Sequence, residues 1–168
     1  MDYKITNVKV SIKMSPISLD NVLQLNFPVK NHNNFAVIKT KYTYSIFKTN
    51  KIFQNHINIT GIPSLDKVED SINYLKEYLD FEILKKPQID NIIANLKLPH
   101  QINLAKVCEK NLFKLMKLNT EKFPGLFVKF DKGTAILFHS GNIVLMGAKT
   151  DNDLKCLTAN ICAAMKML

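Results

Sequence analysis

Hydrophobic and polar residues alternate along much of this chain, a pattern typical of β-strands with one buried face. The alternation covers residues 3–13, 35–43, 44–53 and 57–62, returns at 88–98, and runs again from 123 to about 148. Turn residues that include a glycine interrupt it at 131–133 and 140–142, which is typical of hairpins. The pattern predicts a mainly antiparallel sheet.

Other segments carry apolar residues at helical spacing. We expect a short helix capped by Ser18, a helix from Ser64 to about 79, a helix over about 103–116, and a last helix that Thr150 caps. Residues 27–34 and 118–122 are expected to be loops. The two long helices carry the apolar stripes Leu65, Val68, Ile72, Leu75 and Leu79, and Leu154, Leu157, Ile161, Met165 and Leu168. If both stripes pack on one face of the sheet, the other face is left open for function.

The two halves of the chain share landmarks in one order, about 84 to 88 residues apart. This period is far longer than the roughly 20–50 residues of a solenoid repeat, so it indicates one pseudo-symmetric domain of two repeats, 1–84 and 85–168. The matched landmarks are Asn7-Val8 with Asn91-Ile92, Phe35 with Phe123, Lys41 with Lys129, Ile52-Phe53 with Leu137-Phe138, and Gly61 to Ser64 with Gly147 to Thr150.

The second repeat contains FPGL at 123–126, then Phe138, Ser140-Gly141 and Gly147-Ala148-Lys149. This order of motifs resembles the core of the TATA-binding protein family, closely in the second repeat and more weakly in the first. The resemblance implies an α+β fold, a pseudo-two-fold saddle built from one continuous curved antiparallel sheet with helices on its convex face. It also implies a transcription factor that binds and kinks A·T-rich promoter DNA through the minor groove to nucleate initiation.

The resemblance carries a DNA-binding role over to individual residues. The wedges that pry apart base steps are Phe35, Phe53, Phe123 and Phe138, and the donors to adenine N3 and thymine O2 are Asn7 and Asn91. Other expected groove contacts are Thr60, Ile93, Ile136, Val144 and Pro124, and the expected phosphate contacts are Lys41, Lys129 and Ser140, with Lys39, Lys48, Lys51 and Lys97 as further candidates. Lys9, Asn58 and Met146 depart from the family's pattern, which puts selectivity for TATA sequences in question.

The same resemblance implies partners besides double-stranded DNA. These are initiation factors like transcription factors IIB and IIA, and the RNA polymerase machinery, with Glu121 as the one residue that keeps the family's acidic docking character. A homodimer in the absence of DNA is a further expectation. The implied location is the nucleus, or a cytoplasmic replication site if the protein is viral.

Composition supports an intracellular globular protein with an acidic partner. The net charge is +9, all 23 basic residues are lysine, and the mean hydropathy is −0.04. No apolar run approaches the roughly 18 residues of a membrane span, and no signal peptide is recognised at the N-terminus. Three cysteines and four histidines are scattered without the spacing of a metal site, and no pattern indicates an enzyme or a cofactor.

Two other functions stay open. A divergent interaction platform or competitor would keep the fold and lose TATA recognition, which Lys9, Asn58 and Met146 favour. A substrate-recognition domain for a nuclease or glycosylase would need a catalytic partner subunit. The retained phenylalanines and asparagines favour the promoter-binding function.

Overall fold

The computed structural model of the protein describes residues 2–48, 53–119 and 121–167, without the side chains of Phe53, Gln54 and Asn119. The chain forms two compact units. The N-terminal unit comprises residues 7–90, and the C-terminal unit comprises residues 1–6 and 91–168. The division into one domain of two repeats, 1–84 and 85–168, stays a prediction.

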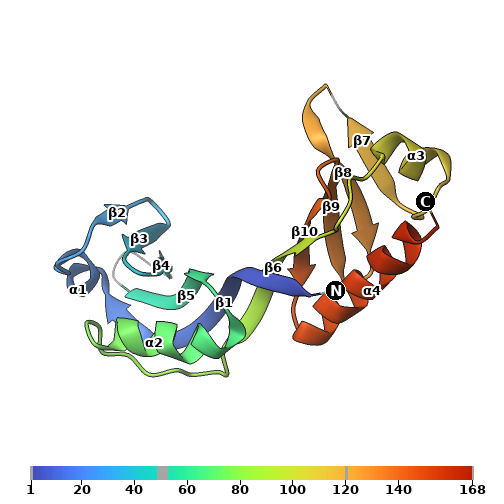
Figure 1. The fold of residues 1–168 in the computed structure, drawn as a ribbon. Coiled ribbons are helices and arrows are strands. Elements are labelled where there is room, and N and C mark those ends of the chain that lie inside the picture. The colour runs from blue at the N-terminus through green and yellow to red at the C-terminus, as the bar shows by residue number, and fades with distance from the viewer. Residues whose placement is uncertain (1, 49–52, 120, 168) are drawn as a thin grey trace. The chain divides into compact units, whose positions relative to one another are not determined.

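The N-terminal unit is a five-stranded antiparallel arrangement with helices on one face (Figure 1). Its strand order is β2 (Val29–Asn31), β3 (Phe35–Lys39), β4 (Thr43–Lys48), β5 (Phe53–Ile62) and β1 (Tyr3–Ser18), of which β1 begins in the C-terminal unit. Its helices are α1 (Leu19–Leu23), the 3₁₀ turn η1 (Leu65–Lys67) and α2 (Val68–Lys76).

The C-terminal unit repeats this plan. Its strand order is β6 (Gln88–Lys97), β10 (Asn142–Ala148), β9 (Gly133–Phe138), β8 (Phe123–Phe130) and β7 (Met116–Asn119), and its helices are α3 (Leu104–Glu109) and α4 (Asp151–Met165). The neighbouring strands pair antiparallel. Each unit therefore reads strand, short helix, strands, long helix, as the sequence predicts.

Alternation along the strands separates a buried face from an open face. In β1 the even-numbered residues Val8, Val10, Ile12 and Met14 are buried, while the odd-numbered residues between them are not. The long helices cover the buried face: the Tyr44 hydroxyl of β4 donates to the Ser71 carbonyl of α2 at 2.7 Å, and the Leu157 side chain of α4 lies against Gly133 of β9. The opposite face of each unit carries mainly half-buried and exposed side chains, with Ile136 of β9 only 8% exposed, and we call it the open face.

The ends of several elements differ from the sequence prediction. The helix expected over 103–116 ends at Glu109, because Asn111 has a left-handed backbone (φ 47°) and the next amide returns to the Val107 carbonyl. Residues 116–119 then form β7 instead of the expected helix end and loop. The expected loop 27–34 contains the short edge strand β2, and the helix expected to reach 79 ends at Lys76.

Two predicted caps are confirmed. The Ser18 hydroxyl accepts the Asn21 amide at the start of α1, and Thr150 and Asp153 form a reciprocal capping box at the start of α4. Ser64 differs, because its side chain makes no capping bond to η1.

Candidate nucleic-acid interface

The open face of the C-terminal unit is built from cross-strand neighbours. Phe127 of β8 lies opposite Ile136 of β9, which lies opposite Val144 of β10, which lies opposite Asn95 of β6. A second row joins Lys129, Thr134 and Met146. Directly opposed residues point to the same side of a sheet, so these side chains form one surface.

A pair of phenylalanine rings lies at one edge of this surface. The rings of Phe123 and Phe138 have centroids 5.8 Å apart, although Gly125 is the residue directly opposite Phe138. The Phe123 ring reaches over Gly125, where an added Cβ would come within 2.6 Å of Phe123 Cε1 and 2.7 Å of Ile136 Cγ2. Glycine at this position is therefore what allows the two rings to meet.

The N-terminal unit carries a matching ring pair, in which the predicted Phe35 has a partner that differs from the prediction. Phe35 of β3 lies directly opposite Phe47 of β4, with ring centroids 5.6 Å apart. Phe53 was expected to match Phe138, but it begins β5, whose counterpart is β10, whereas Phe47 lies near the end of β4 as Phe138 lies at the end of β9. The predicted correspondence is wrong because the hairpin between β3 and β4 is shorter than the one between β8 and β9. The Phe53 side chain itself lies outside the described residues.

The same shift applies to the lysines. Lys39 lies opposite Thr43 as Lys129 lies opposite Thr134, so Lys39 rather than Lys41 is the counterpart of Lys129. Lys41 lies in the turn, and its ammonium group lies 5.3 Å from the ring centre of the buried Tyr42. The phosphate contact expected of Lys41 stays a prediction, and Lys39 takes the place in the N-terminal unit that corresponds to Lys129.

The asparagines form identical clamps in the two units. The Asn7 side-chain oxygen accepts the Gly61 amide at 2.7 Å, and the Asn91 oxygen accepts the Gly147 amide at 2.6 Å. Both glycines have positive φ, 81° and 89°, which brings their N–H groups to the asparagines. Because each oxygen is held by a backbone N–H, the amide nitrogen is the end of the side chain that is left to donate.

Comparison with known proteins agrees with this geometry. A family model described as transcription factor TFIID (or TATA-binding protein, TBP) matches residues 86–168. The TATA-box-binding protein of Picrophilus torridus is 31% identical over 128 residues, which cover 72% of this chain and 67% of that protein. The chain belongs to the TATA-binding protein family.

Two further comparisons concern one related sequence and one solved structure. The TATA-box-binding protein of Sulfolobus acidocaldarius is 33% identical over 131 residues, covering 71% of this chain and 61% of that protein. The solved structure of the Methanococcus jannaschii TBP superposes with a TM-score of 0.84 over the whole of both chains at 22% identity. The matched sequence spans 67% of the Picrophilus protein and 61% of the Sulfolobus protein, and the structural likeness confirms the predicted fold class.

The remaining predicted groove residues divide between the faces. Ile93, Ile136 and Val144 lie on the open face, as does Thr60, which is opposite Thr43; the counterpart of Thr60 in the second unit is Met146. Pro124 is one residue out of phase with Phe123 and Gly125, so strand alternation assigns it to the opposite face.

Ser140 lies in an exposed turn, where its carbonyl accepts the Lys97 ammonium at 2.7 Å. Glu121 is exposed just before β8.

The central rows of the two open faces differ in chemistry. Ser45, Asn58 and Ser11 lie opposite one another in the N-terminal unit, at the places that Ile136, Val144 and Asn95 take in the C-terminal unit. Lys9, the counterpart of Ile93, is 3.5 Å from Asp90, which also accepts the Ser11 hydroxyl at 3.0 Å. Two apolar residues in the centre of one row therefore match a serine and an asparagine in the other.

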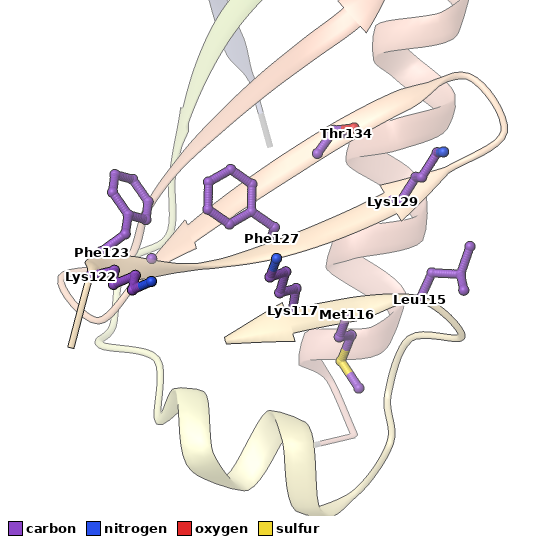
Figure 2. Close-up of a pocket in the computed structure, with 9 residues that line it drawn as sticks. Leu115, Met116, Lys117, Lys122, Phe123, Phe127, Lys129 and Thr134 are labelled. Atoms are coloured by element: carbon purple, nitrogen blue, oxygen red, sulfur yellow. The ribbon is translucent and has the colours of Figure 1, made fainter. Parts of the chain in front are cut away.

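Sequence reasoning missed Phe47 and Phe127. Phe127 is 37% exposed, its ring centroid lies 5.1 Å from that of Phe123, and Figure 2 shows both rings projecting from β8 with Lys117 and Lys122 beside them. Phe127 is in phase with the predicted wedge Phe123 along β8, and Phe47 is in phase with Phe53 along the strand predicted over 44–53, which is the signal that could have found them. Phe127 lies beside the Phe123 ring of the C-terminal unit, and Phe47 lies beside the Phe35 ring of the N-terminal unit.

Among residues 2–48, 53–119 and 121–167, no group of histidine, cysteine or acidic side chains could hold a metal ion. No helix in that part of the chain is long and apolar enough to cross a membrane.

Proposed function

We propose that this chain binds A·T-rich promoter DNA in the minor groove, kinks it, and so nucleates transcription initiation. The observation that carries the proposal is the two phenylalanine ring pairs at matching places on the two open faces, Phe35 with Phe47 and Phe123 with Phe138. An apolar ring inserted between base steps costs a few kcal/mol of unstacking, which is offset by the larger protein surface that the bent DNA contacts.

The rest of the open face suits the same partner. Ile136 and Val144 present no hydrogen-bonding group, so they fit the edge of an A·T pair, which carries no amino group in the minor groove. The clamped asparagines Asn7 and Asn91 hold an amide donor toward adenine N3 or thymine O2. Lys39 and Lys129 lie on the open face, where ammonium groups can contact phosphates.

The finer parts of the proposal concern partners and location. Initiation factors like transcription factors IIB and IIA, with RNA polymerase, would bind the protein–DNA complex, and the exposed Glu121 would contact one of them. The protein would act where its template DNA is kept, in a nucleus if the cell has one. The transcription-factor description of the matching family supports these partners in general.

The test measures affinity and end-to-end fluorescence transfer on a TATA-containing duplex and a G·C-rich duplex at two salt concentrations. The wild-type protein is expected to bind the TATA duplex more tightly and to shorten its end-to-end distance. The double variants Phe123→Ala/Phe138→Ala and Phe35→Ala/Phe47→Ala are each expected to lose the bend. Phe53→Ala is the matched control and should keep it.

Weak, salt-sensitive binding to both duplexes without bending would contradict the wedge mechanism. That result would favour the second candidate, a divergent interaction platform that keeps the fold and has lost TATA selectivity. The polar central row of the N-terminal unit is the observation that favours this alternative.

A further inference from the structure

We propose that the open face of the N-terminal unit accepts G·C base pairs while that of the C-terminal unit requires A·T pairs. The DNA site would then have two unlike halves, and the residues that set the difference are Ser45 and Asn58 against Ile136 and Val144. This inference rests on the proposed function, because it assumes that both open faces contact the minor groove.

The expected difference in base-pair preference between the two open faces rests on one amino group of the DNA. In the minor groove a G·C pair differs from an A·T pair by the guanine N2 amino donor. Against Ile136 and Val144 this donor would lose its water and find no acceptor, which is unfavourable for a buried polar group. Against Ser45 and Asn58 it finds a hydroxyl oxygen and an amide oxygen within the same central row.

The acceptors of the N-terminal row are oriented by their own partners. The Ser11 hydroxyl donates its proton to Asp90 Oδ1 at 3.0 Å, so the Ser11 oxygen keeps its lone pairs for another donor. Asn58 Oδ1 lies 3.1 Å from His56 Nε2, and a carbonyl oxygen can accept a second hydrogen bond. The nearby ammonium group of Lys9, 3.5 Å from Asp90, offsets the carboxylate charge that would otherwise face the DNA.

The row is long enough to meet several base pairs. Its members lie on β4, β5 and β1, and neighbouring strands are about 4.8 Å apart, so three strands span roughly 10 Å. Base pairs of unbent DNA rise about 3.4 Å each. The row can therefore face about three successive pairs, whereas the matching row of the C-terminal unit offers only Asn95 as a polar group.

The test uses three duplexes of equal length: A·T pairs in both halves of the site, G·C pairs in one half, and G·C pairs in both halves. Because the protein can bind in either direction, it can place its N-terminal unit on the single G·C half. The wild-type protein should bind the first two duplexes within about threefold of each other, and the third at least tenfold more weakly, since one unfavourable pair typically costs about 1–3 kcal/mol.

Reciprocal variants exchange the chemistry at matched places. Ser45→Ile/Asn58→Val should weaken binding to the half-G·C duplex by about tenfold or more relative to the binding of the A·T duplex by the same variant. Ile136→Ser/Val144→Asn should strengthen binding to the duplex with G·C in both halves. Thermal unfolding of each variant identifies any loss of affinity that comes from misfolding.

A duplex with inosine in place of guanine isolates the amino group, because inosine lacks N2. It should restore binding of Ser45→Ile/Asn58→Val to the level seen with A·T pairs. If wild-type protein bends the A·T duplex but binds the half-G·C duplex as weakly as the full-G·C duplex, the inference is overturned and the proposed function stands. If it neither binds nor bends the A·T duplex, the proposed function fails first.

Discussion

The two open faces agree at their edges and differ at their centres. Each unit keeps a phenylalanine pair and an asparagine held by a positive-φ glycine. Between these shared features, Ser45 and Asn58 in one unit stand where Ile136 and Val144 stand in the other. The comparison separates two tasks: the shared edge residues suit bending, and the unlike central residues suit reading of base pairs.

The ring pairs themselves are built in two ways. Phe35 meets Phe47 directly across the strands, whereas Phe123 meets Phe138 diagonally, over the space that Gly125 leaves. The C-terminal pair therefore depends on a residue that has no side chain, and the N-terminal pair does not.

The largest expected effect comes from a side chain that fills the space left by Gly125. Gly125→Val should push the Phe123 ring away from Phe138, because even a Cβ would lie 2.6 Å from the ring. We expect the DNA bend to be lost and affinity to fall by ten- to a hundredfold, about 1.4–2.8 kcal/mol. Fluorescence transfer and anisotropy on one labelled duplex measure both quantities. Pro124→Ala, one residue away and out of phase, is the control, and an unchanged bend in Gly125→Val would refute the diagonal pair.

The next effect concerns the long helices. Thr150 caps α4 through a capping box, while Ser64 makes no capping bond to η1. Thr150→Ala should lower the free energy of unfolding by about 1 kcal/mol, and Ser64→Ala by clearly less. Chemical denaturation of both variants decides the comparison, and equal losses would contradict it.

A smaller effect is expected from Asp90, whose carboxylate contacts the polar central row of the N-terminal unit. Asp90→Asn removes a negative charge beside Lys9 and Ser11. DNA affinity should rise about two- to fivefold at low salt, and the slope of log affinity against log salt should steepen by about 0.9 if Lys9 gains a phosphate contact. Glu121→Gln removes an equal charge away from that row and serves as the control. A fall in affinity would mean that Asp90 is needed to orient Ser11.

The smallest expected effect is on the acid stability of the C-terminal unit. Backbone N–H groups of Lys149 and Thr150, with the Thr150 hydroxyl, hold the pKa of Asp153 below its usual value. A lowered carboxyl pKa stabilises the fold above the ordinary value of 3.8, and this contribution is lost as the pH falls through the lowered pKa. Asp153→Asn should therefore flatten the dependence of unfolding free energy on pH in that acidic range. Denaturation at pH 7 and at about pH 3 measures it.

The fold could be predicted well from the sequence because strand alternation and helix stripes are local signals. The repeat correspondence failed where one hairpin is shorter than the other. The segment SIFKTNKIF offers two Ile-Phe pairs, and a nearly constant offset selected Phe53, whereas pairing across the strands selects Phe47. Alternation could not have separated them, because Phe47 and Phe53 are six residues apart and share one phase along the predicted strand, opposite to that of the buried Tyr44 and Ile46.

One other error has a local cause. The helix predicted over 103–116 required Asn111 to be helical, but its left-handed backbone closes α3 instead.

The role of Gly125 became visible only when the Phe123 ring was placed over it. Phe123 and Gly125 lie on β8 and Phe138 lies on β9, so the contact depends on two strands at once, and alternation along one strand does not report it.

The strict alternation of β1 has a consequence for how such a protein changes over time. Val8, Val10 and Ile12 hold the fold from one side of the strand, while Lys9 and Ser11 lie on the other side. A mutation at an odd-numbered position here can alter which DNA the molecule prefers without disturbing the residues that keep it folded. If the chain has the proposed function, one repeat can therefore acquire a new DNA preference while the other keeps the old one.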